Sequence, residues 1–136
     1  MYRVSKRMEI AGAHNLKLPY ESKCSNIHGH NWIVTVHCES NELTEYGMIV
    51  DFAKVKKAIH GKLDHQYINN VLPDGMNPTA ENMAKWIADE VNKICEVGCC
   101  WMVEVQESEG NVAQYIAPFI DRIGGKGHDE YGVEVK

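Results

Sequence analysis

The chain has 136 residues and a net charge of −5; 44% of its residues are hydrophobic and 24% are charged. These values are typical of one globular domain, here residues 1–136, and the scattered lysines and arginines argue against a nucleic-acid-binding surface. No stretch has the length of a membrane span or the pattern of a signal peptide, so we expect a cytoplasmic protein that binds no membrane.

The first part of the chain predicts two strands joined by a polar loop. Residues 2–14 alternate between apolar and polar side chains, and His14 falls on the apolar side. A second strand is predicted over 28–39. Its residues His28 and His30 share a side with its apolar residues, because side chains two apart in a strand point the same way.

Two helices are predicted next. In the segment DFAKVKKAIHGKLD, apolar residues recur at helical spacing, with Asp51 as the expected N-cap and Gly61 as the expected end. An irregular connection leads to a second helix, which is expected to begin between Asn77 and Thr79 and to end at Gly98.

The chain then returns to strands. One is predicted over 99–108, with Glu107 on the same face as Trp101, Val103 and Val105. A short fourth strand is expected within the segment GNVAQYIAPF.

Strands and helices in this order predict an α+β fold rather than a parallel α/β fold. We expect a four-stranded antiparallel sheet with two helices on one face, in the order β-β-α-α-β-β. The two free edges of such a sheet favour pairing with other subunits, so a homo-oligomer is expected. From about residue 119 the Gly-rich, charged tail is atypical.

His28 and His30 are the first candidates for chemistry. Residues two apart in a strand are separated by roughly 6.6–6.8 Å, so both imidazoles can bind one metal ion. His14, on the inner side of the neighbouring strand, is the candidate third ligand. Three histidines with an open fourth position are the pattern of catalytic zinc. The alternative is a cluster of core histidines satisfied by hydrogen bonds.

Cys24 lies in the polar loop, beside Lys23 and near the candidate cation. Positive neighbours favour the thiolate, which can act as a base or nucleophile; the alternative is an exposed or structural thiol. The chain has five cysteines without a CxxC pair, which argues against a zinc ribbon or a thioredoxin-type motif. The other four are expected to be reduced, buried side chains: Cys38, Cys95, Cys99 and Cys100.

Two acidic residues have specific chemical interpretations. Asp64 can fix the tautomer of the adjacent His65 for proton transfer, although a water-exposed pair at a helix end explains the same dipeptide. Glu107 is a carboxylate on an apolar strand face, where an unpaired charge is costly. Either it lies at the solvent-exposed end of the strand, or it accepts hydrogen bonds from two parallel N–H groups of a ligand with a guanidine-like edge.

Taken together, the motifs resemble the 6-pyruvoyl-tetrahydropterin synthase family, whose members share the tunnelling fold (T-fold). The resemblance covers about residues 2–117 through AGAHNL, CSNIHGH, MIVDF, LDHQYIN, NPTAEN and VEVQES. The short gap between the cysteine and HGH is similar to the bacterial 6-carboxy-5,6,7,8-tetrahydropterin synthase branch, whereas pyruvoyl-forming enzymes usually have a longer one. The serine of VEVQES stands where a threonine is usual, and the tail has no counterpart.

This resemblance implies that His14, His28 and His30 bind Zn²⁺ and that Cys24 is the catalytic proton acceptor. The implied reaction converts 7,8-dihydroneopterin triphosphate to 6-carboxy-5,6,7,8-tetrahydropterin with release of acetaldehyde and triphosphate, in queuosine biosynthesis. The alternatives are a 6-pyruvoyl-tetrahydropterin synthase of the biopterin route and a non-catalytic protein that binds metal or pterin.

The resemblance also implies roles for other residues. Asp64 and His65 match a proton relay, and Glu107 matches an acid that anchors the pterin and belongs to the same relay. Thr79 and Glu81 match a motif near the pterin pocket. Family members form trimer-based assemblies, often hexamers, with sites between subunits.

The triphosphate needs a basic partner. We consider Lys17 and Lys23 as candidates, since both fall in the polar loop that carries Cys24.

Overall fold

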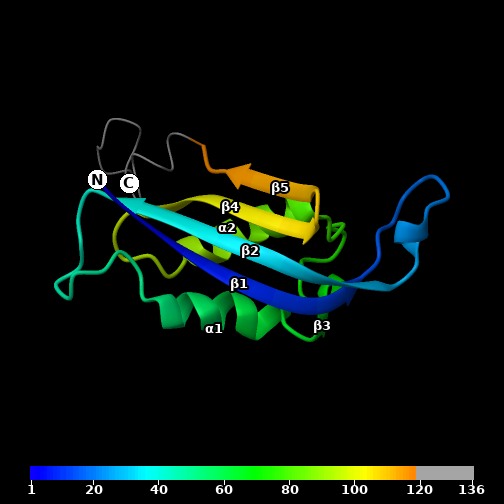
Figure 1. Ribbon diagram of the computed structural model, residues 1–136, viewed down its shortest axis with the longest axis horizontal. Coiled ribbons are helices and arrows are strands. Elements are labelled where there is room, and N and C mark those ends of the chain that lie inside the picture. Colours follow the sequence, from blue (N-terminus) through cyan, green and yellow to red (C-terminus); the bar gives the residue numbers. More distant parts are fainter. Residues whose placement is uncertain (119–136) are drawn as a thin grey trace.

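The computed structural model describes residues 1–118, which form one sheet with helices packed against it (Figure 1). Strands β1 (Tyr2–His14) and β2 (His28–Ser40) pair antiparallel along their whole length, with His14 opposite His28. On the other side of β2, the sheet continues with β4 (Cys99–Ser108) and β5 (Asn111–Ile116). The strands predicted over 2–14, 28–39 and 99–108 are therefore confirmed, as is a short strand in the segment after Gly110.

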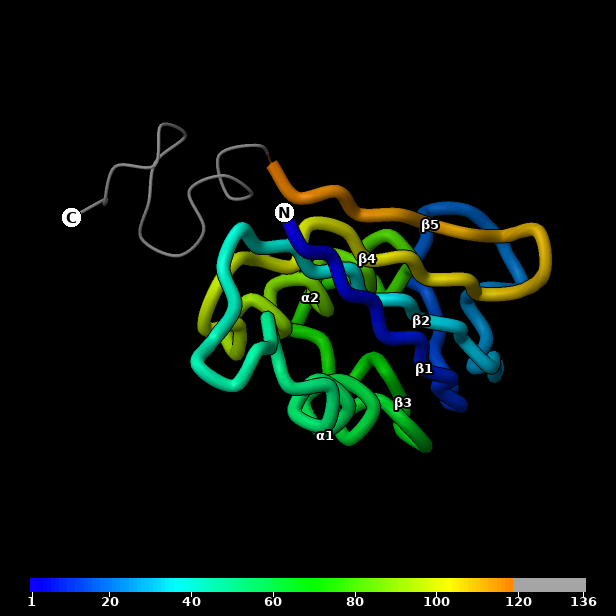
Figure 2. Tube along the Cα trace, turned by 60° about the vertical axis from the view of Figure 1, so that its left-hand side comes forward, coloured from blue at the N-terminus to red at the C-terminus, as the bar shows by residue number. Residues whose placement is uncertain are grey.

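Helices α1 (Phe52–Leu63) and α2 (Ala80–Asn92) lie on the same side of the sheet (Figure 2). Each begins where a polar side chain accepts a backbone N–H: Asp51 from Ala53 at 2.8 Å, and Thr79 from Asn82 at 3.1 Å. The described part of the chain also contains two short 3-10 helices, η1 (Lys23–Ser25) and η2 (Ile68–Asn70). The α+β class with two helices on one face is confirmed.

The core lies between the helices and the inner face of the sheet. Trp32, Val34 and Val36 of β2 are at most 1% exposed, and so are the facing helix residues Ile59 and Ile87. Burying one aliphatic side chain of this size contributes about 1.5–3 kcal/mol, so this layer accounts for much of the folding free energy. It also fixes which side of β1 and β2 faces inward, and with it the direction of the histidines.

The expected four-stranded antiparallel sheet is corrected: residues 1–118 form five strands in a mixed sheet, with the order β3-β1-β2-β4-β5. The additional strand, β3 (Gln66–Tyr67), pairs in parallel with Gly12 and Ala13 of β1. It lies in the segment that we expected to be an irregular connection. Two residues are too few to produce an alternating pattern, so the sequence contains no periodic signal for it.

Two bulges in β4 redirect single side chains. Cys38 pairs with Cys100 and His37 with Met102, so Trp101 is the extra residue of a bulge opposite β2. Its ring lies 4.5 Å from the Arg3 guanidinium carbon, on the outer face. The expectation that Trp101 shares a face with Val103 and Glu107 is therefore wrong, because the bulge rotates it away from the core.

The predicted helix ends also need correction. Helix α1 continues past Gly61 to Leu63, which is fully buried and holds the last turn against the core. Helix α2 ends at Asn92, well before Gly98. Gly98 has φ +63° and marks the entry to β4 instead.

Within residues 1–118, neither helix has the length and hydrophobicity that crossing a membrane requires. The atypical tail expected from about residue 119 lies outside the described residues.

Candidate functional site

Three histidines converge at one end of the β1–β2 pair. His14 is opposite His28, and Gly12 is opposite His30, so both strands present their imidazoles on the inner face. One ring nitrogen from each of the three histidines lies within 4.8 Å of the others. The ring centroids are 4.6–5.1 Å apart. The convergence expected from strand parity is therefore present.

Backbone carbonyls orient two of the rings. Nδ1 of His14 lies 2.8 Å from the Pro78 carbonyl oxygen, and Nδ1 of His28 lies 2.7 Å from that of Asn26. A carbonyl only accepts, so Nδ1 carries the proton in both rings and Nε2 keeps its lone pair. This is how a metal-binding histidine is usually held, with the second nitrogen donating to a fixed acceptor.

Burial favours the neutral form of two of the three imidazoles. His14 is only 1% exposed. Burial lowers the pKa of His14, helped by the neighbouring His28 and His30, although the Pro78 carbonyl and Glu107 act against it. Burial likewise lowers the pKa of His30, against the opposing effect of Glu107. The neutral imidazole is the form that binds metals.

The nitrogens of this cluster fit a cation. Nε2 of His14 and Nε2 of His30 are buried without a hydrogen-bond partner among the described residues. Oε1 of Glu107 lies 3.5 Å and 3.6 Å from these two nitrogens. The lone-pair Nε2 of His14, the unpartnered Nε2 of His30 and a carboxylate oxygen thus face one another, an arrangement that a bound cation would stabilise.

Glu107 owes its position to the second bulge of β4. Gln106 pairs with Val112 and Ser108 with Asn111, so Glu107 has no opposite residue in β5. Its side chain is 29% exposed and points to the inner face beside the histidines. The bulge next to the turn allows a charged side chain on this face without packing it into the core.

Cys24 lies in η1, within the loop that joins the two histidine-bearing strand ends, and is exposed. Its backbone carbonyl accepts the N–H of Leu16 at 2.8 Å, and its N–H donates to Ser22 Oγ at 3.1 Å. Since Leu16 is two residues beyond His14, this bond holds Cys24 at the histidine end of the sheet.

The other four cysteines are buried, as expected. Hydrogen bonds to the thiols of Cys100 and Cys95, together with burial, raise the pKa of Cys38. The Cys38 thiol is therefore not the reactive form, and Cys24 is the exposed cysteine among the described residues.

Asp64 and His65 follow α1 and lie beside β1. Oδ1 of Asp64 accepts the N–H of Ala11 at 3.0 Å, and Oδ2 lies 2.7 Å from Nδ1 of His65. The Ala11 hydrogen bond lowers the pKa of Asp64, and His65 and His60 add to this effect. Asp64 therefore fixes Nδ1 of His65 as a donor and leaves Nε2 available for proton transfer.

The His65 ring points away from the rest of the described chain, with its side chain 80% exposed. Its backbone has φ +59°, an uncommon conformation for a residue other than glycine. Within residues 1–118, no hydrogen bond or ion pair joins His65 to the three histidines or to Cys24. Sequence reasoning missed His60, whose Nε2 lies 3.6 Å from Asp64 Oδ2; its i, i+4 spacing on α1 was the available signal.

Thr79 caps α2, and the adjacent Pro78 carbonyl holds His14, so the NPTAEN segment contacts the site through its backbone. Glu81 is exposed in the first turn of α2. Lys17 and Lys23 are also exposed. The carbonyl of Pro78 was not predicted, because a backbone contact between distant segments leaves no side-chain signature.

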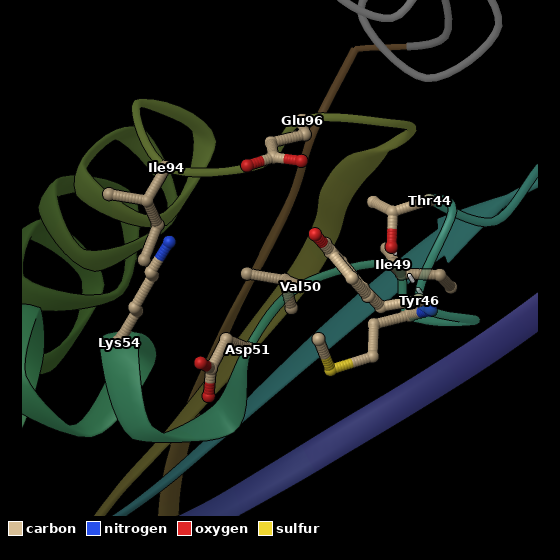
Figure 3. A pocket seen from close by; sticks show the side chains of 9 residues that line it. Thr44, Tyr46, Ile49, Val50, Asp51, Lys54, Ile94 and Glu96 are labelled. Atoms are coloured by element: carbon tan, nitrogen blue, oxygen red, sulfur yellow. Dashed lines mark hydrogen bonds between the residues drawn. The ribbon is translucent and has the colours of Figure 1, made fainter.

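A cavity of about 250 Å³ lies at the other end of the sheet, among the residues that follow β2 and those that precede β4 (Figure 3). Its polar lining includes Thr44, Tyr46, Asp51, Lys54 and Glu96. Since β2 spans about 40 Å between His28 and Ser40, this cavity is remote from the histidines. None of the predicted site residues lines it.

Known proteins resemble this chain in sequence and in fold. The 6-carboxy-5,6,7,8-tetrahydropterin synthase of Bacillus subtilis is 29% identical over 123 residues, which cover 84% of each chain. The human 6-pyruvoyl tetrahydrobiopterin synthase is 33% identical over 132 residues, covering 83% of this chain and 90% of the relative.

A solved structure of the 6-pyruvoyl tetrahydropterin synthase of Caenorhabditis elegans has a TM-score of 0.69 at 22% identity, covering 86% of this chain and 96% of that one. Because the identity is only 22%, this structural similarity supports the fold alone. The sequence profile of the family described as 6-pyruvoyl tetrahydropterin synthase matches residues 3–118, nearly all of the described structure. With the fold, the profile and the relatives in agreement, the chain belongs to the 6-pyruvoyl tetrahydropterin synthase family.

Proposed function

We propose that this protein is a zinc-dependent 6-carboxy-5,6,7,8-tetrahydropterin synthase of the queuosine route, acting on 7,8-dihydroneopterin triphosphate and releasing acetaldehyde and triphosphate. The observation that carries the proposal is the convergence of His14, His28 and His30, with the Cys24 loop joined to the same end of the sheet. Relatives named for this activity include the Bacillus protein and one from Synechocystis, which is 32% identical over 127 residues.

In this proposal His14, His28 and His30 hold Zn²⁺ through one nitrogen each. Bound zinc would act as a Lewis acid on the oxygens of the substrate side chain. The Pro78 and Asn26 carbonyls keep two of the imidazoles in the required tautomer. Burial lowers the pKa of both His14 and His30, which favours the neutral form that binds a metal.

The remaining residues handle protons and position the ring. Cys24 accepts a proton from the substrate side chain, and His65, oriented by Asp64, returns one. Glu107 anchors the pterin by accepting hydrogen bonds from its exocyclic amino group and from the neighbouring ring N–H. It also belongs to the proton relay of Asp64 and His65. Thr79 and Glu81 border the pterin pocket. The exposed Lys17 and Lys23 are candidates for holding the triphosphate.

A 6-pyruvoyl-tetrahydropterin synthase is the second candidate function. The human relative with that name is 33% identical, which is as close as the carboxy-forming relatives. The spacing between Cys24 and His28 favours the carboxy-forming branch.

Product identification decides between the two activities. We expect incubation of the zinc-loaded protein with 7,8-dihydroneopterin triphosphate to yield 6-carboxytetrahydropterin and acetaldehyde, measured by mass spectrometry and an aldehyde assay. A 6-pyruvoyl product without acetaldehyde would establish the second candidate. Binding of zinc and pterin without turnover would identify a non-catalytic protein.

We also propose a single-domain, cytoplasmic protein that assembles as a trimer or a pair of trimers. Only Gly12 and Ala13 of the 13-residue strand β1 pair with β3, so most of this edge is open within residues 1–118. At the opposite edge, β5 has a strand partner on one side only among the described residues. Open edges of this kind are suited to pairing with further strands.

A further inference from the structure

The loop between β1 and β2 is tied down by two side-chain amides from a different part of the chain. Asn69 Oδ1 accepts the N–H of Asn15 at 3.1 Å, and Asn69 Nδ2 donates to the Asn15 carbonyl at 2.8 Å. In the same way, Asn77 Oδ1 accepts the N–H of Lys17 and Asn77 Nδ2 donates to the Lys17 carbonyl, both at 2.8 Å. Each amide thus satisfies both backbone groups of one loop residue, as a neighbouring strand would.

The residue between the two clamped positions holds Cys24. Leu16 donates its N–H to the Cys24 carbonyl at 2.8 Å. Asn15 adds a longer contact from its Nδ2 to the Ser25 carbonyl at 3.4 Å. Because residues 15 and 17 are fixed on both sides of Leu16, the direction of the Leu16 N–H is fixed as well. The backbone position of Cys24 therefore depends on the two asparagines.

The clamps are themselves anchored. The Asn77 carbonyl accepts the N–H of Thr79 at 2.8 Å and Nδ2 of Asn82 at 2.9 Å, which ties it to the first turn of α2. Asn69 follows Ile68, which is fully buried. The loop is thus anchored both to the first turn of α2 and to the core. A reacting group such as a catalytic thiol has to be held in a fixed position, and these anchors provide that.

We propose that Asn69 and Asn77 are positioning residues that act through Cys24. This inference rests on the proposed function, in which Cys24 is the proton acceptor. The chemistry requires an amide, since only an amide side chain donates and accepts at once in this geometry. Aspartate at either position keeps the acceptor but loses the donor, and it brings a carboxylate oxygen against the loop carbonyl.

The test compares Asn77→Asp, Asn77→Ala and Asn69→Ala with the wild type. Asn70→Ala is the matched control, because Asn70 is adjacent, exposed and without a side-chain hydrogen bond among the described residues. We expect kcat to fall about tenfold to a hundredfold in the clamp variants, since displacements near 1 Å have costs of this size. Zinc content is expected to remain within about twofold in all three variants. KM is expected to remain within about twofold in Asn69→Ala, whose clamp does not bind Lys17, the candidate contact to the triphosphate.

Hydrogen–deuterium exchange provides a readout independent of turnover. In the clamp variants, peptides that cover residues 15–24 are expected to exchange about tenfold faster, because the Leu16 N–H loses its fixed direction. Exchange in α1 and β4 is expected to stay unchanged, and Asn70→Ala should match the wild type throughout. Should Asn69→Ala fail to fold, the Asn77 variants, whose clamp lies in an exposed segment, test the inference by themselves.

Cys24→Ala separates this inference from the proposed function. If Cys24→Ala is inactive while the Asn77 variants retain full kcat, the positioning role is overturned and the proposed function stands. If Cys24→Ala remains active, the role of Cys24 in the proposed function is wrong. A parallel loss of kcat, zinc and thermal stability in the Asn77 variants would show a merely structural role and would also overturn the inference.

Discussion

At the scale of single residues, the histidine cluster is defined by what holds each ring. His14 is buried and bonded to Pro78, whereas His28 is bonded to a carbonyl of its own loop, two residues before it. The cluster therefore depends on one long-range contact and one local contact. In the proposed zinc site, removing either ring would leave two histidine ligands, too few for stable binding.

His28→Ala is expected to purify with much less zinc than the wild type. The side chain is at the partly exposed end of β2, so the fold should survive its loss. Elemental analysis measures the metal content. His37→Ala, on the other face of the same strand, is the control and should retain zinc; full zinc in the His28 variant would refute the ligand assignment.

Glu107→Gln is expected to weaken binding of a pterin product analogue. The amide replaces one acceptor oxygen with a donor, which would then face an N–H donor of the ligand. A mispaired buried polar group costs about 1–3 kcal/mol, which is about tenfold to more than a hundredfold in affinity. Calorimetry measures the affinity, and zinc content is expected to change little.

Glu104→Gln is the matched control for that experiment. Glu104 is on the other face of β4, where it accepts a hydrogen bond from Gln114. Its variant should bind the analogue normally. Loss of zinc in Glu107→Gln, rather than loss of pterin affinity, would identify Glu107 as a metal ligand, in keeping with its distance to His14 and His30.

At the scale of elements, the pairing of β4 decides where its side chains point. One bulge turns Trp101 to the outer face. The other leaves Glu107 without an opposite residue in β5, beside the histidines. The start of β4 is set by Gly98, whose backbone approaches the end of β2 closely. A Cβ at this position would lie 2.0 Å from the Glu39 carbonyl oxygen. The strand can enter the sheet here only because that atom is missing.

Gly98→Ala is expected to destabilise the protein strongly. Gly110→Ala is the matched control, since Gly110 also has a positive φ, +86°, but no atom lies within 4 Å of its Cβ position. The control should lose about 1–2 kcal/mol from backbone strain alone. We expect a further loss of about 1–3 kcal/mol or more for Gly98→Ala from the clash. Urea unfolding measures both values, and equal losses would contradict the close approach.

At the scale of the whole molecule, the proposed site uses groups that residues 1–118 of one chain do not bring together. His65 is directed to solvent, while the three histidines lie on the inner face of the sheet. If a second copy pairs with the open edge of β1 or β5, it can place its own His65 near the histidine cluster of the first copy. Assembly and chemistry are thus linked in the proposed function.

We expect the protein to have three or six times its monomer mass in solution. Light scattering coupled to size-exclusion chromatography measures this directly. Dilution into the monomeric range is expected to abolish turnover while zinc remains bound, because each histidine cluster belongs to one chain. A fully active monomer would contradict the link between assembly and activity.

The sequence by itself determined the long strands, both helices and the shared direction of His14, His28 and His30. The reason is that period-2 alternation and helical spacing are local properties, written in consecutive residues. The burial of four of the five cysteines followed from residue type in the same way. The family followed from motifs spread along the chain, and the profile match over residues 3–118 bears it out.

Only the tertiary structure decided the features that depend on how distant segments meet. The two-residue strand β3 exists because Gly12 and Ala13 offer an edge to it, and the bulges at Trp101 and Glu107 arise from the pairing of β4 with its neighbours. The amide clamps on the Cys24 loop likewise join residues more than 50 positions apart. Such contacts leave no periodic trace, since their partners are chosen by the packed fold rather than by the neighbouring sequence.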